Sequence, residues 1–470
     1  MARMRRPTRT ALGLLAALPL AAAAVEPPLT LDDALASAAA ESHELELSRA
    51  DAHQAGADAT GAWQGLLPRL DFTASVGHQY SGPTLQVASF PAFNAQGQPV
   101  VDPKTGQPVF QTLIIQTPYF QFQTDSAQLV LSQPLFDGFA TWNQVASARA
   151  GVRAAARSYD EARLTVAFDV IRRFYELVKG ERSLQVLEAA AARSAELVGR
   201  ADALYAAARA PKADTFTARV NLGNDRIAVE QARTRIVQAR ADLAVALGRP
   251  GDDPVEVVAP TSIDAPGIPG GEPPPLDALL LTAKRRRPAL AAALAQIEEA
   301  EASVGVARAA YWPTLSAQVN YLRNGTALGG AGGVWANPSQ QYSTLAQVVM
   351  NWNLFSGRAT DAAVARAEAA AERTRATAAR TADGVAREVA EARQNVVALT
   401  AQLALAAENL AAAEQGLALA RDRLEAGLAS QLEVRDASLK LTQSQLSVVQ
   451  ARVDRAVAVA DLNRSVGGAL

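Results

Sequence analysis

The segment Leu135-Phe136-Asp137-Gly138-Phe139-Ala140-Thr141 recurs later in the chain as Leu354-Phe355-Ser356-Gly357-Arg358-Ala359-Thr360. The offset of 219 residues between these copies also relates Ala241-Asp242-Leu243 to Ala460-Asp461-Leu462. Upstream, Leu67-Pro68-Arg69-Leu70 resembles Trp312-Pro313-Thr314-Leu315 at an offset of 245 residues. A register that holds over such a distance indicates an internal duplication. The difference between the two offsets indicates an insertion in the first repeat, between the segments at 67–70 and 135–141.

The duplication divides the chain. We expect a first repeat at 25–250, a Pro/Gly-rich linker at 251–275 and a second repeat at 276–470. The Gly/Pro-rich stretch 82–118 is the expected insertion, and we interpret it as a loop.

The first 24 residues resemble a secretory signal peptide. Four arginines within 3–9 precede an apolar run at 11–20, and small residues at 21–24 offer a cleavage site. This apolar run is shorter than the ~20 residues that a spanning helix needs. No later segment offers an uncharged apolar stretch of about 18 residues, so any insertion into a membrane would use strands.

Four segments alternate apolar and polar residues with a period of two. They lie at about 69–80, 119–135, 314–323 and 342–354, two in each repeat. Such alternation over about ten residues is typical of strands in a membrane barrel. A sheet with one face on a soluble core gives the same pattern, so the alternation alone leaves both interpretations open.

The remaining residues favour very long helices. No proline occurs between Pro134 and Pro211 or after Pro338. A helix over 140–208 would reach on the order of 100 Å. Apolar residues recur every seven positions at Val396, Leu403, Leu410, Leu417 and Leu424. This repeat predicts closely packed coiled coils.

Composition excludes several kinds of function. The 45 Lys and Arg nearly balance 47 Asp and Glu, so no basic excess points to nucleic acid. The absence of cysteine excludes thiolate chemistry, and only three histidines occur. No phosphate-binding loop, nucleophile motif or metal constellation appears, so we expect no cofactor and no enzymatic activity.

Four strands cannot close a barrel by themselves. An open sheet edge in hydrocarbon leaves backbone N–H and C=O groups unpaired at high cost. Two copies of the chain would supply about eight strands, and side chains fill the interior of a barrel of that size. Three copies would supply about twelve strands and leave a conduit. We therefore expect a homotrimer of a mainly α protein with membrane β-strands.

Taken together, these features resemble the TolC-type outer-membrane efflux proteins. The resemblance rests on the export signal, the duplicated halves, the repeated segment at 134–139 and 353–358, and the stretch from Arg423 to Ala437. It implies a trimeric 12-stranded β-barrel in the outer membrane of a Gram-negative bacterium, continued by a long periplasmic α-helical coiled-coil barrel. It also implies an exit duct for efflux or type I secretion. The partners so implied are a periplasmic adaptor protein, an inner-membrane pump of the RND or ABC type, and outer-membrane lipid.

A short segment separates the two heptad helices of the second repeat and predicts their turn: Ala426, Gly427, Leu428, Ala429 and Ser430. Gly427 can adopt a positive φ at a helix end, and Ser430 can cap the next helix. The resemblance implies that an adaptor docks at this tip. The counterpart in the first repeat includes Ala208, Arg209 and Ala210, without a glycine.

Two acids follow this turn. Glu433 and Asp436 are three residues apart and share a helix face, where they also complement the helix dipole. The resemblance implies that such acids, six in a trimer, ring a closed periplasmic entrance. Asp214 matches Glu433 in the first repeat. The family's basic partner corresponds to Ala429 here, so we expect no salt-bridge latch at that position.

Other interpretations remain. An exported coiled-coil spacer without channel activity explains the heptads but not the alternating strands. A periplasmic adaptor has one helical hairpin rather than two duplicated halves. A secreted hydrolase that uses Glu433 and Asp436 would need carboxylates on opposite sides of its substrate, which two acids on one helix face do not supply.

Overall fold

The structure is a computed structural model that describes residues 29–253, 255–258, 272–335 and 342–468. The expected signal peptide and the middle of the expected linker lie outside the described residues. The chain forms two compact units. One unit comprises Met1–Leu47, Glu161–Arg287 and Val385–Leu470, and the other comprises Ser48–Asp160 and Pro288–Gly384. Each unit therefore contains parts of both sequence repeats.

The elements follow the same order in each repeat. The helices are α1 (Leu31–Glu41), α2 (His43–Gly61), α3 (Ala140–Ala206), α4 (Lys212–Ala246), α5 (Leu276–Arg286), α6 (Pro288–Arg308), α7 (Ala359–Glu425) and α8 (Gln431–Ser465). The strands are β1 (Arg69–Ser81), β2 (Thr84–Pro91), β3 (Phe110–Thr117), β4 (Phe120–Phe136), β5 (Thr314–Gly325) and β6 (Tyr342–Asn351). Short 3-10 helices, Ala62–Leu66 and Ala309–Tyr311, precede β1 and β5.

The second unit contains an antiparallel sheet of four strands in the order β1-β4-β5-β6. The pairing of β4 with β5 joins the two repeats, with Leu131 opposite Val319. The four predicted strands are confirmed within a few residues. The last one ends at Asn351, so Trp352 and Leu354 lie beyond it.

The two faces of this sheet differ in polarity. Near the helices, cross-strand neighbours on one face are apolar, as in the row formed by Leu70, Leu131 and Val319. Farther along the strands the same face also carries Asp125 and Arg323, both buried. On the other face, polar side chains bond across strands. The Ser75 and Ser126 hydroxyls lie 2.8 Å apart, and Gln128 donates to Asn320 over 3.1 Å. The period-two pattern of the sequence therefore continues across all four strands as an amphipathic sheet.

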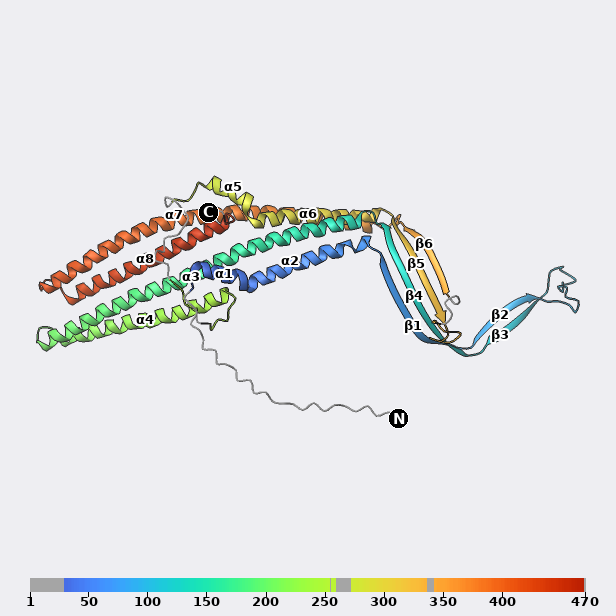
Figure 1. The fold of residues 1–470 in the computed structure, drawn as a ribbon, viewed down its shortest axis with the longest axis horizontal. Helices are drawn as coiled ribbons and strands as arrows, with labels where there is room; N and C mark the ends of the chain where they lie inside the picture. The colour runs from blue at the N-terminus through green and yellow to red at the C-terminus, as the bar shows by residue number, and fades with distance from the viewer. Residues whose placement is uncertain (1–28, 254, 259–271, 336–341, 469–470) are drawn as a thin grey trace, which may run out of the picture. The chain divides into compact units, whose positions relative to one another are not determined.

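Each strand of the sheet adjoins a helix, and Figure 1 shows the pairs α2–β1, β4–α3, α6–β5 and β6–α7. Within this unit the helices also contact one another. The Ser147 hydroxyl of α3 lies 3.1 Å from that of Ser303 on α6, and Arg308 of α6 pairs with Glu368 of α7 over 2.7 Å. The helix order therefore repeats the strand order.

The repeated heptapeptide forms the turn from strand to helix. Gly138 and Phe139 both have positive φ angles, 69° and 67°, as do their counterparts in the second repeat. The Asp137 carboxylate accepts the Thr141 N–H over 2.7 Å and so caps α3. A Cβ on Gly138 would lie 2.6 Å from the Ala309 carbonyl oxygen, which explains the glycine.

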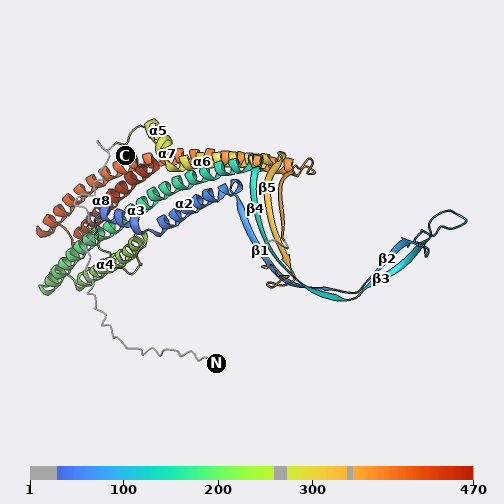
Figure 2. The same ribbon diagram turned by 45° about the vertical axis from the view of Figure 1, so that its right-hand side comes forward.

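The prediction of a loop over 82–118 is wrong. This stretch contains β2 and β3, which pair in antiparallel fashion from Thr84–Thr117 to Pro91–Phe110. Figure 2 shows the resulting two-stranded ribbon, which leads away from the end of β1 and β4. Strand pairing here tolerates the local Gly and Pro content because the prolines fall at the ends of β2 and β3 or outside them.

Each repeat also contains a helix break that the sequence analysis did not foresee. α1 ends at Glu41 with Ser42 as its C-cap, and α5 ends at Arg286 with Arg287 as its C-cap. Two glycines with positive φ, Gly248 and Gly467, pack against these breaks. A Cβ on Gly248 would lie 2.1 Å from the Glu41 carbonyl oxygen.

Arg287 is buried at the second of these breaks. It pairs with Glu161 of α3 over 2.7 Å and with Glu388 of α7 over 3.3 Å, and it donates to the Arg464 carbonyl oxygen of α8. One side chain thus joins three helices of the first unit.

The absence of an uncharged apolar stretch of about 18 residues holds in α7, whose longest uncharged stretch lies between Arg393 and Glu408. Among the described helices, α7 contains a window of 18 residues with a mean hydropathy of 1.5, enough by length and composition alone. Only 11% of that window is buried in the chain. Alanine supplies much of the apolar count in α7, and small side chains allow close packing between helices.

Candidate functional site at the hairpin tips

The turn between α7 and α8 has the predicted geometry. Gly427 has a φ of 74°, its N–H donates to the Leu424 carbonyl over 3.1 Å, and the Leu428 N–H donates to the Arg423 carbonyl over 2.7 Å. These two bonds form a Schellman motif, which ends α7. The Ser430 hydroxyl accepts the Glu433 N–H over 3.3 Å and caps α8. The structural roles predicted for Gly427 and Ser430 are confirmed.

The turn between α3 and α4 has the same shape without the glycine. Ala208 occupies the position of Gly427 with a φ of 54°, and the Arg209 N–H donates to the Leu204 carbonyl over 2.8 Å. Pro211 replaces the capping serine and offers no side-chain hydrogen bond. The first tip is therefore strained where the second is not.

Both acids that follow the second turn have basic partners. The Glu433 carboxylate lies 3.0 Å from Arg423 of α7, and the Asp436 carboxylate lies 2.7 Å from Lys440 of α8. Ala429 supplies no partner, as expected, but Arg423 does so from the preceding helix. All four side chains are at least two-fifths exposed, so each pair contributes about 1 kcal/mol or less.

The two acids and Lys440 lie along one groove of the α7–α8 hairpin. This groove has a volume of about 720 Å³ and lies between α7, from Gln402 to Ala420, and α8, from Glu433 to Ser447. Asp214 lies elsewhere, at a second and smaller cavity. The structure therefore brings Glu433 and Asp436 together and separates Asp214 from them within one chain.

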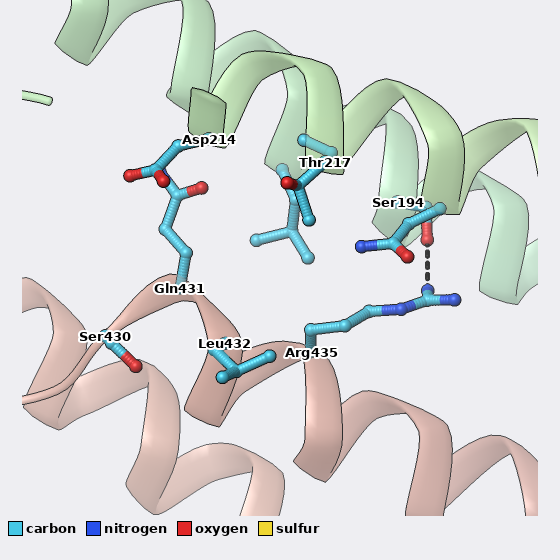
Figure 3. Close-up of a pocket in the computed structure, with 10 residues that line it drawn as sticks. Ser194, Asp214, Thr217, Ser430, Gln431, Leu432 and Arg435 are labelled. Atoms are coloured by element: carbon cyan, nitrogen blue, oxygen red, sulfur yellow. Dashed lines mark hydrogen bonds between the residues drawn. The ribbon is translucent and has the colours of Figure 1, made fainter. Parts of the chain in front are cut away.

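Asp214 lines a cavity of about 170 Å³ between the α3–α4 hairpin and α8. Figure 3 shows Asp214 and Thr217 on α4 facing Gln431 and Arg435 on α8 across this cavity. The two tips of one chain therefore meet through these polar side chains together with the apolar Leu197, Ala218 and Leu432.

A largely buried ion pair, with side chains 12% (Arg435) and 14% (Asp225) exposed, joins the two hairpins beside this cavity. Arg435 of α8 donates to Asp225 of α4 over 2.7 and 3.0 Å and to the Ser194 hydroxyl of α3 over 2.7 Å. Ser194 also donates to Asp225. Burial raises the pKa of the Asp225 carboxyl, but hydrogen bonds from Arg435 and Ser194 lower it by more, so this pKa lies below its ordinary value.

Arg193, the residue before Ser194 on α3, also contacts α8. Arg193 donates to Thr442 over 2.9 Å and to Ser438 over 3.3 Å, both on α8. Arg435, Asp225 and Arg193 could not be predicted as a site from the sequence, because no local spacing relates Arg435 to residues more than 200 positions away. The one available signal was that Arg435 directly follows Val434, which is buried.

The geometry favours no catalytic chemistry. Glu433 and Asp436 lie on one helix with basic partners rather than facing each other across a substrate space. Among the described residues, no group of three or more His, Asp or Glu side chains could hold a metal ion.

Comparisons with known proteins agree with this arrangement. The family model described as "Outer membrane efflux protein" matches residues 34–249 and 279–468. Protein CyaE of Bordetella pertussis is 30% identical over 202 residues, which is 42% of this chain and 40% of that protein. The alignment thus spans less than half of that relative.

Solved structures resemble the chain over nearly its whole length. The structure of CusC, described as undergoing conformational changes with folding and transmembrane channel formation, matches with a TM-score of 0.75 and 18% identity over 93% of this chain and 92% of that chain. The open-state outer membrane channel MtrE of Neisseria gonorrhoeae matches with a TM-score of 0.73 and 18% identity over 93% and 89%. These similarities show that the fold is shared.

Proposed function

Because the chain belongs to the outer membrane efflux protein family, we propose that it is the outer-membrane channel of a tripartite efflux or type I secretion system. Three copies form a 12-stranded barrel, and their helices continue the duct into the periplasm. Cargo passes from the periplasmic assembly to the exterior. The outer membrane of a Gram-negative bacterium is the location that this role requires.

The amphipathic sheet is the observation that carries this proposal. Within the described residues, β1 and β6 each pair on one side only, and one sheet face is largely apolar, apart from the buried Asp125 and Arg323, while the other is largely polar. Barrel strands in an outer membrane place apolar residues toward lipid and polar residues toward the lumen. An open edge in lipid is costly, so the sheet requires other copies on both sides.

Exposed apolar residues on the helical hairpins support the same assembly. On α7 and α8, Leu405, Leu419 and Leu432 are each at least 60% exposed in the single chain. On α4, Val220 and Val237 are comparably exposed. Soluble helices seldom leave such residues uncovered in rows, so neighbouring hairpins of a trimer account for them.

The acids at the second tip are proposed as the periplasmic gate. Three copies bring Glu433 and Asp436 of each chain near the threefold axis, where a ring of carboxylates attracts cations. Arg423 and Lys440 offset part of this charge. Asp214, at the smaller cavity between hairpins, belongs to the wall of the tip rather than to the ring.

The turns themselves are proposed as the docking site for a periplasmic adaptor that connects to an inner-membrane pump of the RND or ABC type. Leu428 is 72% exposed at the second tip. At the matched position of the first tip stands Arg209, which is also exposed. The two tips therefore offer an adaptor different chemistry, one apolar and one basic.

The channel and the exported spacer give different results in one experiment. The channel requires detergent for extraction, a mass of three copies in the detergent complex, and ion conductance in planar bilayers. A detergent-independent soluble chain without conductance would favour the spacer.

The gate has its own test in the same bilayers. Glu433→Gln together with Asp436→Asn removes six carboxylates from the trimer and is expected to reduce the preference for cations. Arg423→Gln leaves Glu433 without its partner and is expected to increase that preference. If conductance and ion preference are the same in both variants as in the native channel, the gate lies elsewhere.

A further inference from the structure

The ribbon formed by β2 and β3 is ordered to its end. Beyond the paired strands, the Ala92 N–H donates to the Val109 carbonyl over 2.7 Å and the Val100 N–H donates to the Ala92 carbonyl over 2.6 Å. The Asn94 side chain accepts two backbone N–H groups of the tip turn, and the Asp102 carboxylate accepts another. These turn hydrogen bonds hold the far end of the ribbon in a defined conformation.

The ribbon strands carry no charge, and apolar side chains are exposed on both faces among uncharged polar ones. Between residues 84 and 117 the charged residues are Asp102 and Lys104, both at the far tip. Val87 is opposite Ile114 on one face, and Ala88 is opposite Leu113 on the other. The apolar side chains that are more than half exposed are Leu85, Val87, Phe90, Phe93, Val101, Phe110, Leu113 and Ile114.

Such a ribbon is not stable alone in water. A two-stranded hairpin is marginal by itself, and both its edges are open within the described residues. Uncharged apolar strands of this length also promote association. The usual protection of edges by charged residues is absent from β2 and β3.

The bilayer cannot cover it. A membrane strand needs about 9–11 residues, and β1 and β4, with 13 and 17 residues, supply that length below the ribbon. The pairing of β4 with β5 ends at Asp125, whereas that of β4 with β1 continues to Phe120. The ribbon begins beyond that point, outside the barrel wall.

The register shows which face of the ribbon points toward the axis. Ser81 pairs with Phe120 and Thr84 pairs with Thr117, so the two ladders share one register across the join. Val87 and Ile114 therefore lie on the sheet face that carries Ser75 and Ser126 in the barrel. That face lines the lumen if the channel proposal holds, and along the ribbon it carries the apolar Leu85, Val87, Phe110 and Ile114 beside the polar Ser89, Thr112 and Gln116.

We propose that the three ribbons of a trimer pack against one another through the Val87–Ile114 face and narrow the outer mouth of the channel. Only the other copies place a second apolar surface opposite this face. Adjacent ribbons start about 14 Å apart at the rim, three strand spacings, and packed sheets lie about 10 Å apart. Pro83 and Pro118, which lack an N–H, fall at the join and weaken the ladder there. Both views show the ribbon bend at this join (Figures 1 and 2).

Because the chain contains no cysteine, one substitution tests this contact. Any disulfide in Val87→Cys or Ile114→Cys trimers must join two copies. We expect oxidation to give a covalent dimer on non-reducing gels for both variants. Ala88→Cys, the adjacent residue on the opposite face, is the matched control and is expected to stay monomeric.

Labelling with a water-soluble maleimide gives the second readout. In reduced trimers we expect residue 87 to react on the order of tenfold more slowly than residue 88, since packing buries the first. Rapid labelling at 87 without cross-linking would overturn the proposal and indicate a free surface or an unrelated partner. Protection in lipid vesicles but not in detergent would also overturn it, because lipid would then be the cover.

The inference rests on the proposed trimeric channel, but the two fail separately. A conducting trimer without contact between ribbons refutes only the ribbon proposal. A chain that forms no trimer refutes the proposed function itself.

Discussion

Ala208 and Gly427 occupy matched positions at the two tips and share a left-handed backbone conformation. The glycine adopts it freely, whereas the alanine pays a steric penalty of about 1–2 kcal/mol from its Cβ. Nothing in the described structure lies within 4 Å of a Cβ built on Gly427, so the backbone alone sets the difference.

Exchanging the two residue types is expected to move the steric penalty from the first tip to the second. Ala208→Gly should stabilise the first turn by about 1 kcal/mol, and Gly427→Ala should destabilise the second by a similar amount. Hydrogen exchange of peptides that cover each turn measures the local opening free energy. Equal hydrogen-exchange rates in the native and variant proteins would contradict backbone strain at Ala208.

Arg435 and Asp225 hold the two hairpins together with little access to water. Arg435→Leu leaves a buried carboxylate uncompensated and should cost about 3 kcal/mol at the tips. A double-mutant cycle with Asp225→Asn separates the pair from its surroundings. Near-additive losses in thermal unfolding would show that the two side chains do not interact.

The same pair predicts an acid dependence. The pKa of Asp225 is lowered in the folded protein, chiefly because hydrogen bonds overcome the effect of burial. Its contribution is therefore complete above the unfolded pKa of about 3.9 and is lost as the pH falls through the lower folded value. Unfolding midpoints of the native protein should fall more steeply below pH ~4 than those of Asp225→Asn. Parallel curves would exclude Asp225 as the source.

At the scale of elements, glycines at the ends of α4 and α8 secure the helix breaks of both repeats. Gly248 approaches α1 and Gly467 approaches α5, each with a positive φ. The offset of 219 residues that relates these glycines also relates the two copies of the strand-to-helix turn. The duplication therefore preserves packing contacts as well as sequence.

Gly248→Ala should be among the most destabilising small substitutions in the chain. Its Cβ would overlap the Glu41 carbonyl oxygen in a backbone conformation that alanine resists, which predicts a loss of about 2 kcal/mol or more. Gly199→Ala, in the exposed interior of α3, is the control and should stabilise by up to about 1 kcal/mol. Thermal unfolding of both variants is the measurement. Equal unfolding midpoints would contradict the close packing of Gly248 against Glu41.

Elements with strong periodicity could be predicted from the sequence, and those set by distant contacts could not. The alternation at 69–80 and 314–323 identified β1 and β5, and the absence of proline identified α3 and α7. The ribbon at 84–117 was missed because its prolines and glycines mask a strand pair. At the tips, Gly427 and Ser430 followed from local turn chemistry, whereas the contact between Arg435 and Asp225 depends on how two hairpins pack.

At the scale of the whole molecule, one chain supplies a four-stranded amphipathic sheet and two long hairpins with uncovered apolar rows. Both features require copies of the chain at their sides. The family assignment, the open edges of β1 and β6 and the polar inner face are consistent with one closed wall around a conduit.

Pairing of β1 with β6 between copies tests this account most directly. We would place one cysteine in β1, at Thr73, and a second at successive positions of β6 from Ser343 to Gln347. Within one chain the two edges are three strand spacings apart, about 14 Å, too far for a disulfide. The account predicts that oxidation of at least one pair yields a covalent trimer, while either single cysteine yields none. Purified channels in which no pair links copies, or in which the chain remains monomeric, would contradict it.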